Sequence, residues 1–174
     1  AVFITHAQGF CGLSDKLLEI LKEKSIILIE DVCESHGASF KDKKLGTYGL
    51  MSNFSFYYAH HMTTIEGGMV CTNDENVYQM LKMYRGHGMV RESTNDNLIK
   101  KYADENPSLN PKFIFAYPAY NLRNNEIGAI IGKNQINNLD RNILLRNENH
   151  SIFLEKINNK NFITDFVLSG QSNY

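Results

Sequence analysis

A strand–helix–strand pattern at the start of the chain restricts the fold more than any other feature. Val2-Phe3-Ile4 is a short β-rich run, and Ser14 can cap a following helix whose apolar residues recur at helical spacing. Residues 26–29 form a continuous apolar run, which is typical of a buried strand in a parallel sheet. Parallel strands joined by a helix require a right-handed crossover. We therefore expect an α/β fold with a mostly parallel sheet and helices on both faces.

The same alternation continues along the chain. We expect strands at 53–57 and 69–72, followed by a helix over 76–84 that Asp74 caps. This helix should bury the face that carries four apolar side chains, Val77, Met80, Leu81 and Tyr84.

The second half of the chain is more polar. Residues 92–112 are rich in Asn, Asp and Lys and contain two prolines, a composition that predicts a mobile loop. A helix should begin near Asn124 and run toward Leu139. A polar helix over 141–157 should then lead out of the domain.

Composition limits the classes of function. A formal net charge of −1 provides no basic field for a nucleic acid or an anionic membrane. No apolar stretch reaches the roughly 20 residues that a membrane-spanning helix needs, and no signal peptide is visible. The three cysteines are widely spaced and odd in number, which favours a reducing compartment and therefore the cytoplasm. The chain starts and stops beside apolar runs, so we expect it to be a fragment.

Two carboxylates, Glu30 and Asp31, follow the apolar run at 26–29. Ligands of open α/β sheets bind outside the carboxyl ends of the strands, so this pair is a candidate site. Such a carboxylate is either solvated and caps a loop, or pairs with a buried cationic heterocycle such as a protonated pyridine. The pair alone does not decide between these two interpretations.

The segment 53–68 contains a second set of candidate groups. The Ser55 hydroxyl can donate a hydrogen bond to a phosphate, and Gly67 and Gly68 let the backbone approach a ligand closely. A plain surface loop is the alternative interpretation of this segment.

The adjacent histidines His60 and His61 suggest a metal site, with Cys33 or His36 as further ligands. However, neighbouring side chains of an extended segment point in opposite directions, and no H-x-x-x-H or C-x-x-C pattern supplies the remaining ligands. We therefore predict no metal site.

Two further motifs adjoin predicted helices. Tyr120-Asn121-Leu122-Arg123 precedes one helix, and Arg85-Gly86-His87-Gly88 follows another. Helix capping explains each of them, and so does a loop that brings polar and cationic groups to a ligand.

The order and spacing of these pieces carry a resemblance that no single piece carries. From residue 1 to about residue 150, the chain resembles the DegT/DnrJ/EryC1/StrS family of sugar aminotransferases, which are pyridoxal-phosphate-dependent enzymes of fold type I. The motifs that carry the resemblance are Ile29-Glu30-Asp31-x-Cys33-Glu34-Ser35-His36-Gly37-Ala38, Leu45-Gly46-Thr47-Tyr48-Gly49, Phe54-Ser55-Phe56, Thr63-Thr64-x-Glu66-Gly67-Gly68, Arg85-x-His87-Gly88 and Tyr120-Asn121-x-Arg123-x-x-Glu126.

The resemblance implies roles for four residues. Asp31 matches the carboxylate that pairs with the pyridine nitrogen of pyridoxal 5'-phosphate, and Ser55 matches the serine that contacts the cofactor phosphate. Asn121 matches the asparagine that reaches the phosphate of the neighbouring subunit's cofactor, which implies a homodimer with shared active sites. His36 matches a position that lines the cofactor pocket.

The resemblance also implies a domain organisation. Residues 1–140 would form part of the cofactor-binding large domain, which resembles that of aspartate aminotransferase. Residues 141–174 would begin the connection to a C-terminal small domain. Because the family's N-terminal phosphate loop and its small domain are missing from this chain, we expect the fragment by itself to be inactive.

His60 stands where most of the family has the lysine that forms a Schiff base with the cofactor. Imidazole forms no stable Schiff base of this kind, and no lysine lies between Lys44 and Lys82. The same His-His pair resembles one branch of the family, the 3-dehydratases of 4-keto-6-deoxy nucleotide sugars, which use pyridoxamine 5'-phosphate. In that branch the histidine moves a proton, and an imidazole with an ordinary pKa of about 6.5 can do this near neutrality.

We therefore expect an enzyme of deoxysugar and O-antigen polysaccharide biosynthesis that removes the 3-hydroxyl of a nucleotide-activated 4-keto-6-deoxy sugar, with His60 as the catalytic residue. A sugar aminotransferase of the same family is the first alternative. A family member that has lost its chemistry and serves as a binding or scaffold protein is the second. The joint presence of Asp31, Ser55 and Asn121 argues against the second alternative.

Overall fold

The computed structural model describes residues 1–157 and 160–172. The chain folds into two compact units. The first contains Ala1–Cys71 and Glu126–Tyr174, and the second contains Thr72–Asn125.

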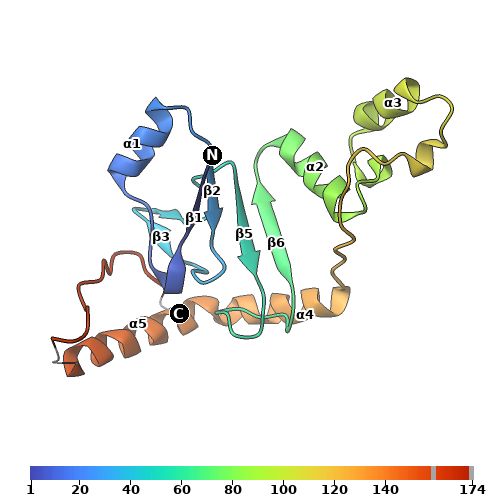
Figure 1. Cartoon of the computed structure of the whole chain (residues 1–174). Helices are drawn as coiled ribbons and strands as arrows, with labels where there is room; N and C mark the ends of the chain where they lie inside the picture. Colours follow the sequence, from blue (N-terminus) through green and yellow to red (C-terminus); the bar gives the residue numbers. More distant parts are fainter. Residues whose placement is uncertain (158–159, 173–174) are drawn as a thin grey trace. The chain divides into compact units, whose positions relative to one another are not determined.

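The main sheet has four strands in the order β1 (Val2–Thr5), β2 (Leu28–Asp31), β5 (Met51–Ser55) and β6 (Gly68–Thr72) (Figure 1). Strands β1, β2 and β5 pair in parallel, so their carboxyl ends lie at one edge of the sheet. Strand β6 runs in the opposite direction (Figure 1). A separate antiparallel pair consists of β3 (Ser39–Phe40) and β4 (Lys43–Lys44). The predicted α/β fold with a mostly parallel sheet is confirmed.

Helix α1 (Asp15–Glu23) connects β1 to β2, after a short 3-10 turn η1 (Ala7–Gly9). The Ser14 hydroxyl accepts a hydrogen bond from the backbone N–H of Leu17 at 3.2 Å, which confirms the predicted cap. Leu21 of the helix is buried in one cluster with Leu28 and Val32. Each buried aliphatic side chain of this kind stabilises the fold by roughly 2 kcal/mol.

Strands β2 and β5 each lie two residues away from their predicted positions. The start of the apolar run at 26–29 belongs to the helix connection, since the backbone N–H of Ile26 donates to the Leu21 carbonyl, and Ile27 is 50% exposed. Along β2 burial alternates, with Leu28 and Glu30 buried. The continuous buried strand expected from the sequence is therefore wrong. Because side chains alternate along a strand, Glu30 and Asp31 point to opposite faces of the sheet.

Glu30 is a fully buried carboxylate that fixes the loop before β5. It accepts hydrogen bonds from the backbone N–H groups of Gly46, Tyr48 and Gly49 at 2.7–2.8 Å, and from His6 Nε2 at 3.2 Å. Burial alone would raise the pKa of Glu30, but these donors together lower it. Of the two carboxylates singled out in the sequence, Glu30 therefore has a structural role.

The second unit contains α2 (Glu75–Arg85), η2 (Val90–Glu92), α3 (Asp96–Glu105) and η3 (Pro111–Phe113). The mobile loop predicted for residues 92–112 is wrong, because this segment contains α3. Asn95 caps α3 by accepting from the backbone N–H of Leu98 at 3.1 Å. The apolar residues of α3 pack against a cluster of buried Met83, Val90 and Ile114.

Only part of the predicted buried face of α2 is found, since Val77 and Leu81 are half-buried. The helix buries Gln79 and Met83, whereas Met80 is 40% exposed and Tyr84 is 36% exposed. The Gln79 amide oxygen accepts from the Ser93 hydroxyl at 2.7 Å and from the backbone N–H of Thr94 at 2.9 Å. A buried polar side chain thus turns the helix away from the face that hydrophobicity alone predicts.

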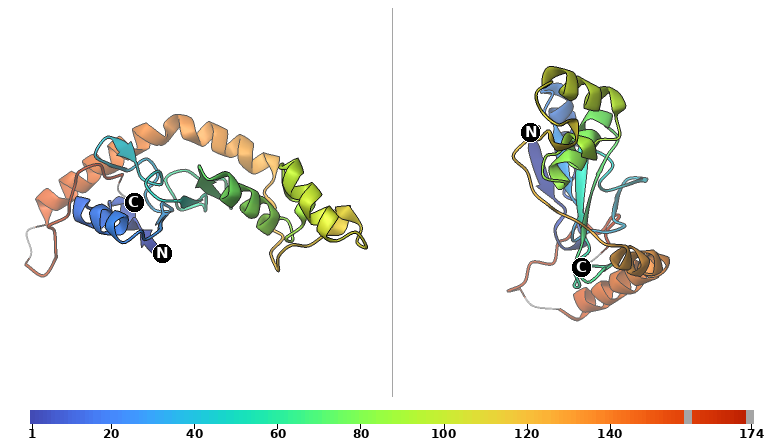
Figure 2. Two further views of the ribbon diagram at one scale, coloured as in Figure 1. Left: turned by 90° about the horizontal axis from the view of Figure 1, so that it is seen from above. Right: turned by 90° about the vertical axis from the view of Figure 1, so that its right-hand side faces the viewer.

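Helix α4 (Glu126–Gln135), η4 (Ile136–Asn138) and α5 (Leu139–Lys156) run in succession, as the sequence predicts. They pass across the carboxyl ends of the strands (Figures 1 and 2). Contact is close, since a Cβ added to Gly37 would lie 2.3 Å from Ile143. None of the helices within residues 1–157 and 160–172 combines the length and the apolar character of a membrane-spanning segment.

Replacing Glu30 with Gln should destabilise the protein by about 3 kcal/mol, because three N–H groups would lose their buried anionic acceptor. Urea unfolding measures the effect. Glu23→Gln is the control, since the Glu23 side chain is 69% exposed and its ion pair with Lys24 contributes less than about 1 kcal/mol. Equal stabilities of the two variants would contradict the structural role of Glu30.

Candidate active site

Asp31 lies at the carboxyl end of β2 with an oriented side chain. Its Oδ1 accepts from the Cys33 backbone N–H at 3.1 Å and from Asn53 Nδ2 at 2.9 Å. Its Oδ2 has only a long contact, 3.5 Å, from the Thr5 hydroxyl. One oxygen therefore holds the carboxylate in place, and the second retains acceptor capacity for a ligand.

Ser55 lies at the carboxyl end of the neighbouring strand β5. Its hydroxyl oxygen accepts from the backbone N–H of Tyr57 at 3.3 Å. No described residue accepts the hydroxyl proton of Ser55, which can therefore be donated to an anion. The backbone N–H of Phe56 donates to the Gly67 carbonyl at 2.9 Å and closes the β5–β6 loop beside Ser55.

His60 lies in a turn that directly follows β5, where its backbone N–H donates to the Tyr57 carbonyl at 3.1 Å. The ring is half-buried, and this burial lowers the pKa of His60. The carboxylates of Glu34 and Asp31 oppose that effect. The imidazole and both carboxylates therefore interact at the same edge of the sheet.

His36 lies beneath this edge and is 3% exposed. Its ring centroid lies 5.8 Å from that of His60 and 5.7 Å from that of His61. Neither ring nitrogen forms a hydrogen bond of normal length with a described residue. Burial, reinforced by His61 and His60, lowers the pKa of His36 to about 4, and the nearby Ser55 carbonyl only partly opposes this. His36 is therefore neutral at physiological pH.

The expectation that His60 and His61 point in opposite directions is wrong. Residues 58–62 form a turn and bends instead of an extended segment, and both rings reach His36. Among residues 1–157 and 160–172, no group of three or more His, Cys, Asp or Glu residues is arranged to hold a metal ion.

Sequence reasoning missed Glu34 as a site residue. Its Oε2 accepts from the backbone N–H of Gln8 at 2.7 Å, and its charge acts on His60. The signal was present as a second carboxylate three residues after Asp31. Cys33, between them, is a protonated thiol because burial and Asp31 raise its pKa to about 11.

Asn121 lies in the second unit and is exposed. It forms a backbone bridge with Gly86, and its side-chain oxygen accepts from Arg123 Nε at 2.9 Å. Arg123 also lies 3.7 Å from a carboxylate oxygen of Glu92. The structure thus brings together Asp31, Ser55, His36 and His60 in the first unit, and it holds Asn121 in an ordered loop of the second.

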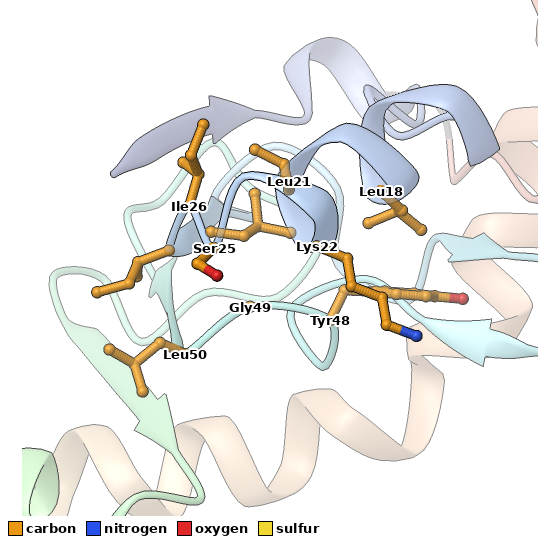
Figure 3. A pocket seen from close by; sticks show the side chains of 10 residues that line it. Leu18, Leu21, Lys22, Ser25, Ile26, Tyr48, Gly49 and Leu50 are labelled. Carbon is orange, nitrogen blue, oxygen red and sulfur yellow. The ribbon is translucent and has the colours of Figure 1, made fainter.

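A depression of about 320 Å³ lies elsewhere, between α1 and residues 48–50 (Figure 3). It opens beside the amino ends of β2 and β5. Its lining is mostly apolar and includes Leu18, Leu21 and Leu50, with Lys22 at the rim. No carboxylate or histidine lines it, so the chemistry lies at the opposite ends of the strands.

The sheet and the residues at its carboxyl edge have the fold of the pyridoxal-phosphate-dependent aminotransferases. Over 97% of the chain, the structure superposes on Escherichia coli GDP-4-keto-6-deoxy-D-mannose-3-dehydratase with bound hydrated PLP, with a TM-score of 0.82 and 35% identity. That superposition covers 43% of the E. coli chain. The model of the DegT/DnrJ/EryC1/StrS aminotransferase family matches residues 1–170. The chain belongs to this family.

Two kinds of curated relatives resemble the sequence. GDP-4-keto-6-deoxy-D-mannose 3-dehydratase of Yersinia pseudotuberculosis is 37% identical over 174 residues, which is 100% of this chain and 44% of the relative. The GDP-perosamine synthase of Escherichia coli O157:H7 is 29% identical over 158 residues, covering 91% of this chain and 38% of the synthase. The chain thus spans less than half the length of these relatives.

The histidine cluster predicts a pH dependence. Because His36 has a folded-state pKa of about 4 against an ordinary 6.5, unfolded chains bind a proton that the folded protein excludes. Stability from His36 is therefore complete above pH 6.5 and is lost as the pH falls toward 4, by about 3 kcal/mol in total. In an NMR titration, the chemical shift of the His36 ring protons at pH 5.5 should still be that of the neutral ring. A His36 midpoint near 6.5 would contradict this burial.

Proposed function

We propose that the whole protein, of which this chain is a part, is a pyridoxamine-phosphate-dependent 3-dehydratase of a nucleotide-activated 4-keto-6-deoxy sugar. The observation that carries the proposal is a half-buried histidine at position 60 that interacts with the carboxylates of Asp31 and Glu34. The similarity to the GDP-4-keto-6-deoxy-D-mannose 3-dehydratases supports it.

The residues at the strand ends fit pyridoxal 5'-phosphate or its pyridoxamine form. Asp31 Oδ2 retains acceptor capacity for a protonated ring nitrogen, and the Ser55 hydroxyl proton is available to a phosphate. When bound, the cofactor supplies an electron sink next to the substrate carbon. Asp31 would hold the ring nitrogen protonated, Ser55 would hold the phosphate, and His36 would support the pocket from below.

His60 would act as the acid and base of the reaction. Because burial lowers its pKa, the imidazole is neutral and able to accept a proton at neutral pH. Glu34 and Asp31 oppose this lowering of the pKa, because both carboxylates stabilise the protonated form of the ring. No lysine lies between Lys44 and Lys82, so the cofactor would be held here by non-covalent contacts.

A sugar aminotransferase is the second candidate, and the similarity to GDP-perosamine synthases favours it. That reaction, however, uses a lysine that forms a Schiff base with the cofactor, and the imidazole at position 60 cannot form one. An inactive scaffold remains a hypothesis that no observation favours.

The proposal extends to the assembly and the domains of the whole protein. The whole protein would be a cytoplasmic homodimer in which Asn121 completes the partner's site. Ile127 and Ile130 on α4 are 72% and 70% exposed, and apolar surface of this kind supports association with further protein. Residues 1–140 would belong to the large domain, and 141–174 would lead toward a small domain.

In the full-length protein, replacing His60 with Asn should reduce turnover by at least about 100-fold, because the group that accepts and donates the proton is lost. Binding of pyridoxamine phosphate, followed by absorbance, should change little. Lys100→Asn is the control, since Lys100 is an exposed residue of the second unit. Full turnover by His60→Asn would refute the role of His60.

The shared site can be tested by complementation. Asn121→Ala and His60→Asn dimers should each be inactive, whereas subunit exchange should restore about a quarter of the wild-type activity, because half of the dimers become mixed and one of their two sites is intact. Activity that stays at the level of the separate variants would contradict the sharing of sites. A Leu109→Ala variant, altered at an exposed residue, should need no complementation.

A further inference from the structure

The segment that follows α5 returns to the site from more than a hundred residues away in the sequence. Two backbone hydrogen bonds place residues 170 and 172 beside the chain that follows β1 and β2. Ser172 is fully buried there, and its backbone N–H donates to the Gly9 carbonyl at 3.0 Å. The Ser39 backbone N–H donates to the Gly170 carbonyl at 2.7 Å. The segment 170–172 is therefore anchored to η1 and to β3.

His61 contacts this segment directly. Its Nε2 lies 2.9 Å from the Ser172 carbonyl oxygen, and the ring is 4% exposed. A carbonyl only accepts hydrogen bonds, so Nε2 must carry the proton. The His61 ring also lies 5.7 Å from the His36 ring, which lies 5.8 Å from the His60 ring, centroid to centroid. A continuous chain of contacts thus connects Ser172 to the imidazole of His60.

The local geometry of the segment permits little displacement. Gly170 has a φ of +71°, and a Cβ added there would lie 2.1 Å from the Ser39 carbonyl oxygen. Asn147 of α5 donates its side-chain N–H to the Gln171 carbonyl at 3.1 Å. The Ser172 carbonyl is thus a fixed acceptor for His61.

We infer that His61 is a positioning residue for His60, held by its hydrogen bond to the Ser172 carbonyl. The two histidines are neighbours in one turn, so the orientation of His61 fixes the backbone that carries the His60 ring. This inference rests on the proposed function of His60. It explains why a second histidine, buried and already engaged through Nε2, follows the first.

The test uses the full-length protein with pyridoxamine phosphate and a 4-keto-6-deoxy nucleotide sugar. His61→Phe keeps a ring but removes the donor, and kcat should fall about 100-fold while KM changes little, since misplacement by about 1 Å has a cost of this size. His61→Gln places an amide N–H near the Nε2 position and should recover most of kcat. Gly170→Ala should reproduce the kcat loss by displacing the acceptor. Equal kcat losses in His61→Phe and His61→Gln would overturn the inference.

A readout independent of turnover separates this inference from the proposed function. The ¹⁵N spectrum of the wild-type histidine rings should show a protonated Nε2 in His61, and Gly170→Ala should shift this signal. An unprotonated Nε2 in His61 would overturn the inference whatever the enzyme catalyses. Absence of any turnover in the wild type, with the expected Nε2 signal present, would refute only the proposed function.

Discussion

The alternation of side chains along β2 underlies the rest of the structure. Glu30 and Asp31 are adjacent, so the Glu30 carboxylate lies in the core and the Asp31 carboxylate lies on the opposite face, at the carboxyl edge of the sheet. Glu30 fastens the Gly46–Gly49 loop through three N–H groups and thereby fixes where β5 begins. Since Ser55 lies at the far end of β5 and is followed by the turn of His60, one buried carboxylate sets the register in which Asp31, Ser55 and His60 meet.

The histidine cluster shows how burial prepares the site. His36, His60 and His61 pack together beneath the carboxyl ends of the strands, and burial lowers the pKa of both His36 and His60. The carboxylates of Glu34 and Asp31 oppose the lowering of the pKa at His60, whereas at His36 the two neighbouring histidines add to it. A neutral ring with moderate basicity suits proton transfer, whereas the fully buried ring serves packing.

Sequence patterns predicted the parallel sheet, the caps of α1 and α2, and the residues that gather at the strand ends. They failed where a buried polar group replaced an apolar one, as with Gln79 on α2, and where polar composition concealed the helical spacing of Leu98, Ile99 and Tyr102. They also missed Glu34, and the contact between His61 and Ser172, because a hydrogen bond between residues 111 positions apart leaves no local pattern. The assignment of His60 to the position of the family's lysine rests on the resemblance and stays a prediction.

The proposed function differs from that of an aminotransferase in its product, because proton transfer by His60 would lead to loss of a hydroxyl group and not to transfer of an amine. Mass spectrometry can identify the product that the full-length protein forms from a 4-keto-6-deoxy nucleotide sugar and pyridoxamine phosphate. We expect a sugar that has lost the oxygen at C3 and gained no nitrogen. A 4-amino sugar that retains the 3-hydroxyl would contradict it.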